Sequence, residues 1–65
     1  MSKAEAIKQL RRALRAANLP APKDPAASHE RDEHGEIVAA SMGFRVGYME
    51  GAIREALAEL GATDI

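Results

Sequence analysis

The segment IVAASMGFRVGYMEGAIREALAEL, residues 37–60, decides the fold that we expect for this chain of 65 residues. Its content of Ala, Met, Leu and Glu favours a helix, and its apolar residues do not alternate with the period of two typical of a strand. At about 100° per residue, the apolar side chains of such a helix fall on two faces. A chain this short can cover only one of them, so the pattern predicts an oligomer or a bound partner.

The first face consists of large side chains at spacings of three and four, and we predict that it forms the core within the chain. Its residues are Val38, Met42, Val46, Met49, Ile53, Leu57 and Leu60. The opposite face is flatter. We predict that it contacts a partner or a second copy, because aromatic rings beside small residues offer contact area at low entropic cost. Its residues are Ile37, Ala40, Phe44, Gly47, Tyr48 and Gly51.

Three glycines of the segment follow one another at intervals of four, namely Gly43, Gly47 and Gly51. Each glycine inside a helix costs about 1 kcal/mol relative to alanine. A ladder of small residues lets a second helix approach closely, and such a contact would offset the cost. A kink or turn between Gly43 and Gly47 is the alternative.

The remaining sequence predicts a shorter helix at residues 3–18, which Ser2 and Glu5 start with a capping-box pattern. One apolar stripe follows in it, formed by Ile7, Leu10, Leu14 and Ala17. Two prolines predict a stiff connector at residues 19–24, because proline lacks an amide donor and restricts the residue before it.

A second helix is predicted at residues 25–60, because Asp24 followed by proline is a favourable helix start. It is either continuous or broken near Gly35, and Gly61 is expected to end it. We therefore expect a single all-α domain over residues 1–65: a helical hairpin that associates into a dimeric or higher helical bundle.

Composition supports a small globular domain, since 46% of the residues are apolar and 29% are charged. A domain of this size buries only about 60% of its unfolded surface, and without cysteine no disulfide can stabilise it. Self-association is the remaining source of stability. Arg45 and Glu50 argue against a membrane span, because each costs on the order of 3 kcal/mol at a bilayer centre. With no apolar stretch of the signal-peptide kind, we expect a cytoplasmic protein.

Charge is segregated along the chain. Residues 1–23 hold six Lys or Arg against one Glu, a net +5, and residues 24–65 hold three Arg against nine acids, a net −6. Four bases lie opposite the apolar stripe of the first helix and are candidates for contact with an anion or nucleic acid: Lys8, Arg11, Arg12 and Arg15. A solvated face, or pairing with acids of another copy, is favoured, because no aromatic residue lies among these bases.

The sequence HERDEH at residues 29–34 raises the question of a metal site. On a helix, His29 faces Glu33, and Glu30 faces His34. The two histidines are about 140° apart on the helical wheel, unlike those of the zinc-protease pattern HExxH, and cannot share one ion. We expect no metal and no cofactor. Because no nucleophile, base and orienting group stand together, we expect no enzyme activity either.

A further pattern comprises Val38, Ala39, Met42, Gly43, Phe44 and Met49. It resembles the helix-turn-helix motif of DNA-binding proteins, in which a small residue in the first helix is followed by a glycine four positions later. The resemblance implies a DNA-binding regulator as the alternative function. Arg45-Val46-Gly47 departs from the motif, which has a Ser or Thr cap after its turn. We instead expect a homo-oligomer that acts by binding another protein, as small regulators, inhibitors, adaptors, toxin antidotes and phage-encoded inhibitors do.

Overall fold

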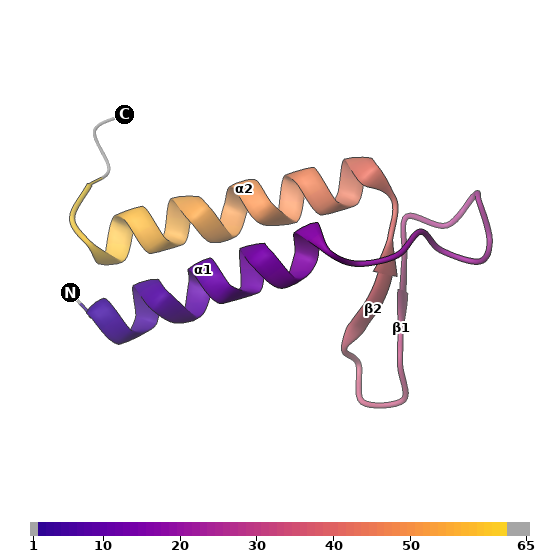
Figure 1. Ribbon diagram of the computed structural model, residues 1–65, viewed down its shortest axis with the longest axis horizontal. Helices are drawn as coiled ribbons and strands as arrows, with labels where there is room; N and C mark the ends of the chain where they lie inside the picture. The colour runs from indigo at the N-terminus through magenta and orange to yellow at the C-terminus, as the bar shows by residue number, and fades with distance from the viewer. Residues whose placement is uncertain (1, 63–65) are drawn as a thin grey trace.

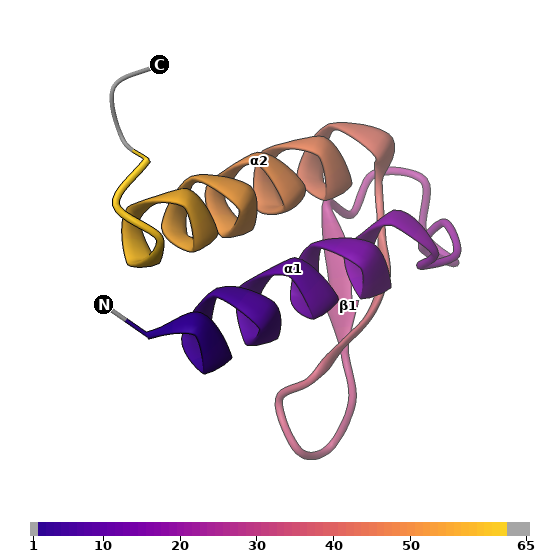
Figure 2. The ribbon, with the colours of Figure 1, turned by 60° about the vertical axis from the view of Figure 1, so that its left-hand side comes forward.

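The computed structural model describes residues 2–62 as a helix, a β-hairpin and a second helix (Figure 1). The elements are α1 (Lys3–Ala17), β1 (His29–Arg31), β2 (Ile37–Ala40) and α2 (Met42–Glu59). The helices lie antiparallel, side by side, and form one layer, with the hairpin packed near the end of α1 and the start of α2 (Figures 1 and 2). The expected all-α class is therefore wrong, because a two-stranded antiparallel sheet separates the two helices.

The first helix begins where its cap predicts. The hydroxyl oxygen of Ser2 accepts a hydrogen bond from the Glu5 amide at 3.1 Å, which satisfies one of the free donors of the first turn. The Ser2 amide donates to a carboxylate oxygen of Glu59 at 3.2 Å. This last contact joins the start of α1 to the end of α2.

The second helix predicted from residue 25 does not form there, because aspartate side chains stabilise turns instead. Asp24 accepts a hydrogen bond from the Ala26 amide at 2.9 Å, which closes a local turn and not a helix. Asp32 accepts from the amides of His34 at 2.8 Å and Glu36 at 3.0 Å. Gly35, at a φ of 79°, completes the hairpin turn in a conformation that suits glycine.

The strands pair antiparallel, with His29 opposite Ala40 and a bulge after Glu30. Ser41 then separates β2 from α2, because its hydroxyl oxygen accepts from the Phe44 amide at 3.3 Å and caps the helix. From there α2 runs without a break to Glu59, so no kink occurs at its glycines. The predicted stop at Gly61 is confirmed, since its φ is 76° and its amide donates to the Ala58 carbonyl at 3.0 Å.

Only alanine side chains are fully covered in the part of the chain that the structure describes. The buried apolar residues are Ala6, Ala13, Ala16, Ala39, Ala40, Ala52 and Ala56. Five of them belong to α1 and α2, and their small side chains allow the two helices to approach closely. The predicted core is therefore wrong for five of its seven residues, since Val38, Met42, Val46, Ile53 and Leu60 are exposed, while Met49 and Leu57 are half-buried. Ile7, Leu10 and Leu14 of the first helix are exposed as well. Spacing identifies an apolar stripe but does not reveal which stripe faces the neighbouring helix.

The alanine contact predicts a specific response to added volume. Ala56 is 1% exposed and lies in the second half of α2, away from the hairpin, where α1 is the neighbouring element of the described chain. Ala56→Leu should lower the free energy of unfolding by about 1–3 kcal/mol, because the larger side chain separates the helices. Ala58→Leu adds the same atoms at an exposed position and should change it by less than about 0.5 kcal/mol. Urea denaturation measures both, and equal stabilities for the two variants would contradict the close contact.

Candidate binding surfaces

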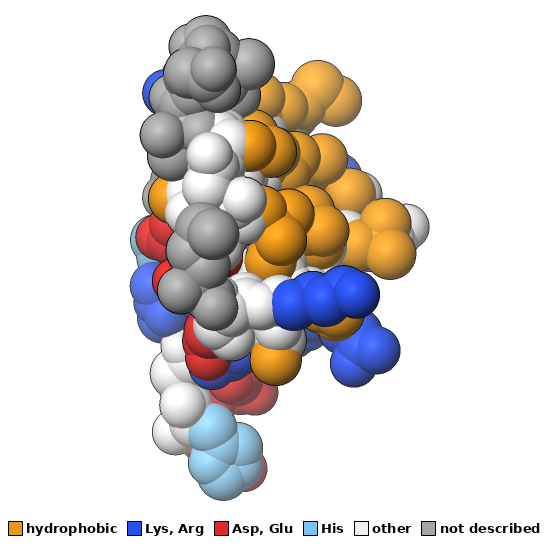
Figure 3. All heavy atoms as spheres, turned by 90° about the vertical axis from the view of Figure 1, so that its left-hand side faces the viewer, with side chains coloured by type: hydrophobic (Ala, Val, Ile, Leu, Met, Phe, Trp, Pro, Cys, Tyr) orange, Lys and Arg blue, Asp and Glu red, His pale blue; other side chains and the backbone are white. Residues whose placement is uncertain are grey.

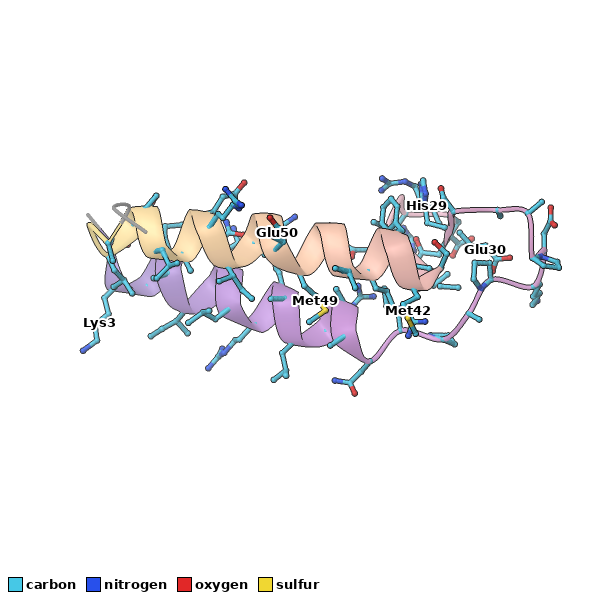
Figure 4. The ribbon with its side chains drawn as sticks, turned by 90° about the horizontal axis from the view of Figure 1, so that it is seen from above. Lys3, His29, Glu30, Met42, Met49 and Glu50 are labelled. Carbon is cyan, nitrogen blue, oxygen red and sulfur yellow. The ribbon has the colours of Figure 1, made fainter. Side chains whose placement is uncertain are left out.

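One side of the helix layer is an open apolar surface, which we call the apolar face. It comprises Ile7, Leu10 and Leu14 of α1, Met42, Val46, Met49, Ile53 and Leu57 of α2, and Leu60, which caps the end of α2. Figure 3 shows hydrophobic side chains gathered on this side, and Figure 4 shows Met42 and Met49 on the side away from His29. Leu14 is 67%, Met42 70% and Val46 56% exposed, so large side chains of both helices meet water.

Helix geometry explains why these side chains share one side. In each helix the large apolar residues lie about 100° around the axis from the buried alanines. Because the helices are antiparallel, the same rotation from their mutual contact leads to the same side of the layer. On α2 the face is hollowed by about 670 Å³, lined by Val46, Met49, Ile53 and Leu57 and bordered by a Glu50–Arg54 ion pair of 2.7 Å.

The other side of the layer, toward the hairpin, carries a cavity of about 510 Å³ that we call the basic groove. It is lined by residues of α1, of the hairpin and of the first half of α2. They are Lys8, Arg12, Arg15, Ala16, Leu19, Arg31, Gly35, Glu36, Ile37, Phe44, Arg45 and Tyr48. Five of them are cationic and one is a carboxylate, a net charge of +4 in a chain whose net charge is −1.

Three arginines of the groove donate hydrogen bonds to uncharged acceptors. Arg12 donates from Nε to the Tyr48 hydroxyl at 3.0 Å, and its guanidinium carbon lies 5.4 Å from the centre of that ring. Arg45 donates from Nη1 to the Leu19 carbonyl at 3.0 Å, and Arg31 donates to the Gly35 carbonyl at 2.7 Å. Among residues 2–62 the ion pairs are Arg54–Glu50 and His34–Glu33, so none of the groove's five cations is in one.

A stack of rings forms one wall beside these cations. His29 of β1 stacks on Phe44 of α2 with centroids 4.4 Å apart and planes at 24°. The rings of Phe44 and Tyr48 also stack, with centroids 6.4 Å apart and planes at 27°. The stack connects the hairpin to α2 and ends at Arg12 of α1. It therefore fixes Arg12 relative to the hairpin.

The residues predicted to contact a partner lie in different environments in the structure. Of the flat stripe, Ile37, Phe44 and Tyr48 line the groove, whereas Ala40 is buried. Gly47 and Gly51 are exposed, and a Cβ added to either would meet no atom within 4 Å. Within residues 2–62, no second helix lies on the glycine ladder. Whether the stripe contacts another chain stays a prediction.

Of the four predicted anion contacts, Lys8, Arg12 and Arg15 line the groove and Arg11 does not. Sequence reasoning did not group Arg31 and Arg45 with these bases, because both reach the groove only through the hairpin and the capped start of α2. No periodicity connects them with α1, and the only available signal was the turn chemistry of the aspartate before Gly35.

The residues considered as metal ligands make other contacts in the structure. His29 stacks on Phe44 and lies 2.8 Å from the Ser28 hydroxyl, while a carboxylate oxygen of Glu30 accepts from the Lys23 amide at 2.9 Å. Glu33 and His34 form an exposed pair of 3.3 Å in the hairpin turn. Within the described residues, no three His, Asp or Glu side chains come together as a metal site.

The arrangement of a helix-turn-helix motif is absent from the residues that resemble it. Val38 and Ala39 belong to a strand, and Met42 to Met49 lie in one uninterrupted helix. This resemblance is therefore wrong about the local structure, because Ser41 ends a strand and starts a helix at the position where the motif needs a first helix. DNA binding by other means is not tested by this observation.

Comparison of the chain with protein-family models, with curated proteins and with solved structures found no match. No helix in residues 2–62 has both the length and the apolar character needed to cross a membrane. The apolar face and the basic groove are therefore the features of the structure that bear on function.

The exposed glycines of α2, Gly47 and Gly51, form an open strip, and replacing one of them by alanine is expected to increase stability. Gly47→Ala should raise the free energy of unfolding by about 0.5–1 kcal/mol, because alanine removes the entropic cost of a helix glycine and its Cβ meets nothing. Gly35→Ala is the matched control and should destabilise by about 1–2 kcal/mol, because its φ of 79° is unfavourable for alanine. Thermal or urea denaturation distinguishes the two signs. A loss of stability in Gly47→Ala would mean that another chain covers the strip.

Proposed function

We propose that the protein is a homodimer in which two apolar faces pair to form a four-helix bundle, and that this dimer acts by binding another protein. The observation that carries the proposal is the open apolar face, because every large side chain on it remains partly in water in the single chain. Residues covered within the chain are alanines, which contribute little hydrophobic stabilisation each. Pairing the faces would add the burial that the chain lacks.

A second copy suits this face in shape. Leu10 and Leu14 project from α1, and the hollow between Val46, Ile53 and their neighbours lies on α2. A two-fold axis through the apolar face would place α1 of each copy against α2 of the other copy. The leucines of each α1 would then fit into the hollow on the opposing α2, and this contact would occur twice. In this isologous pairing both copies use the same apolar face, so no additional surface is required.

The area of the apolar face is compatible with the same arrangement. An 18-residue helix is about 27 Å long. Two helices side by side give a footprint of roughly 500–600 Å² per copy, near the lower end for specific interfaces.

Dimerisation through the apolar face leaves the outer side of α2 free. That side presents Gly47 and Gly51 as a flat strip beside Phe44 and Tyr48, and we assign the contact with a partner protein to it. The proposal is a regulator, inhibitor or adaptor without chemistry of its own, acting in the cytoplasm. A chain without cysteine is compatible with that reducing compartment.

The dimer is expected to respond to charge on its interface. Val46→Glu should shift the light-scattering mass from two chains to one, because a carboxylate would be buried between the faces. Ala58→Glu adds the same charge on an exposed part of α2 outside the apolar face and should remain dimeric. If the Val46→Glu variant unfolds, the melting temperature of the unmodified chain is measured at several protein concentrations instead. The melting temperature of a dimer rises with protein concentration, whereas that of a monomer does not. A single-chain mass with a concentration-independent melt would contradict the dimer.

The partner surface has a separate test. Gly47→Leu should abolish capture of the partner protein, because leucine prevents close approach to the strip, and it should leave the dimer mass unchanged. Retained capture would remove the strip from the partner contact. Loss of the dimer in Gly47→Leu, with a dimer retained in Val46→Glu, would instead assign self-association to the glycine strip.

A further inference from the structure

We propose that the basic groove binds a compact polyanion that carries two or more phosphate groups. Four of its five cations are arginines, whose planar guanidinium groups match phosphate oxygens by paired hydrogen bonds. Its volume of about 510 Å³ falls in the range of small-molecule sites. The groove is formed within one chain and is separate from the dimer interface, so this inference does not depend on the proposed function.

Three of the five cations are held in place by uncharged acceptors and are not neutralised. Arg12 is fixed by the Tyr48 hydroxyl, and Arg45 by the Leu19 carbonyl, so both arginines are positioned by groups that carry no charge. The single carboxylate of the lining, Glu36, leaves four positive charges without a counterpart in the groove. Like charges gathered in this way repel one another, and a bound polyanion would relieve that repulsion.

A compact ligand fits better than an extended one. Several phosphate groups place three or four negative charges within a small volume, whereas carboxylates of a protein segment would need as many separate side chains. A nucleic-acid strand would continue beyond the groove toward Asp32 and Glu33, which are exposed at the tip of the hairpin. At physiological salt the screening length is about 8 Å, so a small ligand inside the groove responds mainly to the bases around it.

Tyr48 has a positioning role in this site. Its hydroxyl accepts hydrogen bonds from both Nε and Nη2 of Arg12, and its ring lies against the same guanidinium group. The stack from His29 through Phe44 holds the Tyr48 ring in turn. Removing the hydroxyl should therefore weaken ligand binding without changing any charge.

The test is calorimetric titration of the full chain with sodium tripolyphosphate, followed by ATP and AMP. We expect binding in the micromolar range for the first two and much weaker binding for AMP, because affinity follows the number of phosphates. Tighter binding of ATP than of tripolyphosphate would identify a nucleotide, and equal binding a free oligophosphate.

Matched variants separate a built site from general charge. Arg12→Gln and Arg15→Gln should each weaken tripolyphosphate binding by about tenfold or more. Arg11→Gln removes the same charge from the same helix outside the groove lining and should change binding less than about threefold, an effect of general charge alone. Tyr48→Phe should weaken binding with no change in net charge. Circular dichroism verifies that each variant remains folded.

Three results would overturn the proposal. They are the absence of tripolyphosphate binding at millimolar concentration and low salt, an equal loss in Arg11→Gln and Arg12→Gln, and tighter binding of a single-stranded oligonucleotide than of tripolyphosphate. The last would assign the groove to nucleic acid.

Discussion

The contact of α1 with α2 through alanines is the constraint from which the other features follow. Alanine side chains allow the helices to lie close together, but they offer little apolar area to bury. The large apolar residues are placed about a quarter turn away, where the neighbouring helix of the same chain covers them only in part. The chain thus has a well-defined internal contact and, at the same time, an unburied apolar surface. The side chains that could form a core therefore lie on the outside of the single chain.

The β-hairpin has the second organising role. Asp32 and Gly35 form its turn, and Ser41 ends β2 and starts α2 within a single residue. This path brings Arg31 and Arg45 to the same side of the layer as the bases of α1. The stack from His29 to Tyr48 then connects the hairpin to the helix layer. Charges that are distant in sequence are gathered in one groove by these local interactions.

The two surfaces lie on opposite sides of one thin layer. Because the apolar face and the basic groove share no lining residue, pairing of two copies would leave both grooves accessible. The two sides nevertheless share α2, whose Val46 belongs to the apolar face and whose Tyr48 belongs to the groove. A shift of α2 in the dimer would move Tyr48 and, through it, Arg12. The proposed dimer and the proposed ligand site would therefore be connected through one helix.

The sequence by itself determined the features that depend on neighbouring residues. The Ser2 cap, the Gly61 stop, the two-faced apolar pattern of α2 and the basic face of α1 all follow from side chains within a few positions of one another. Tertiary structure decided which stripe of each helix meets the other, because a stripe of alanines and a stripe of large residues have the same period. It also decided the strands, since Ile37–Ala40 has too few residues to reveal a period and becomes a strand only by pairing with His29–Arg31. The groove depends on that pairing, and no local pattern contains it.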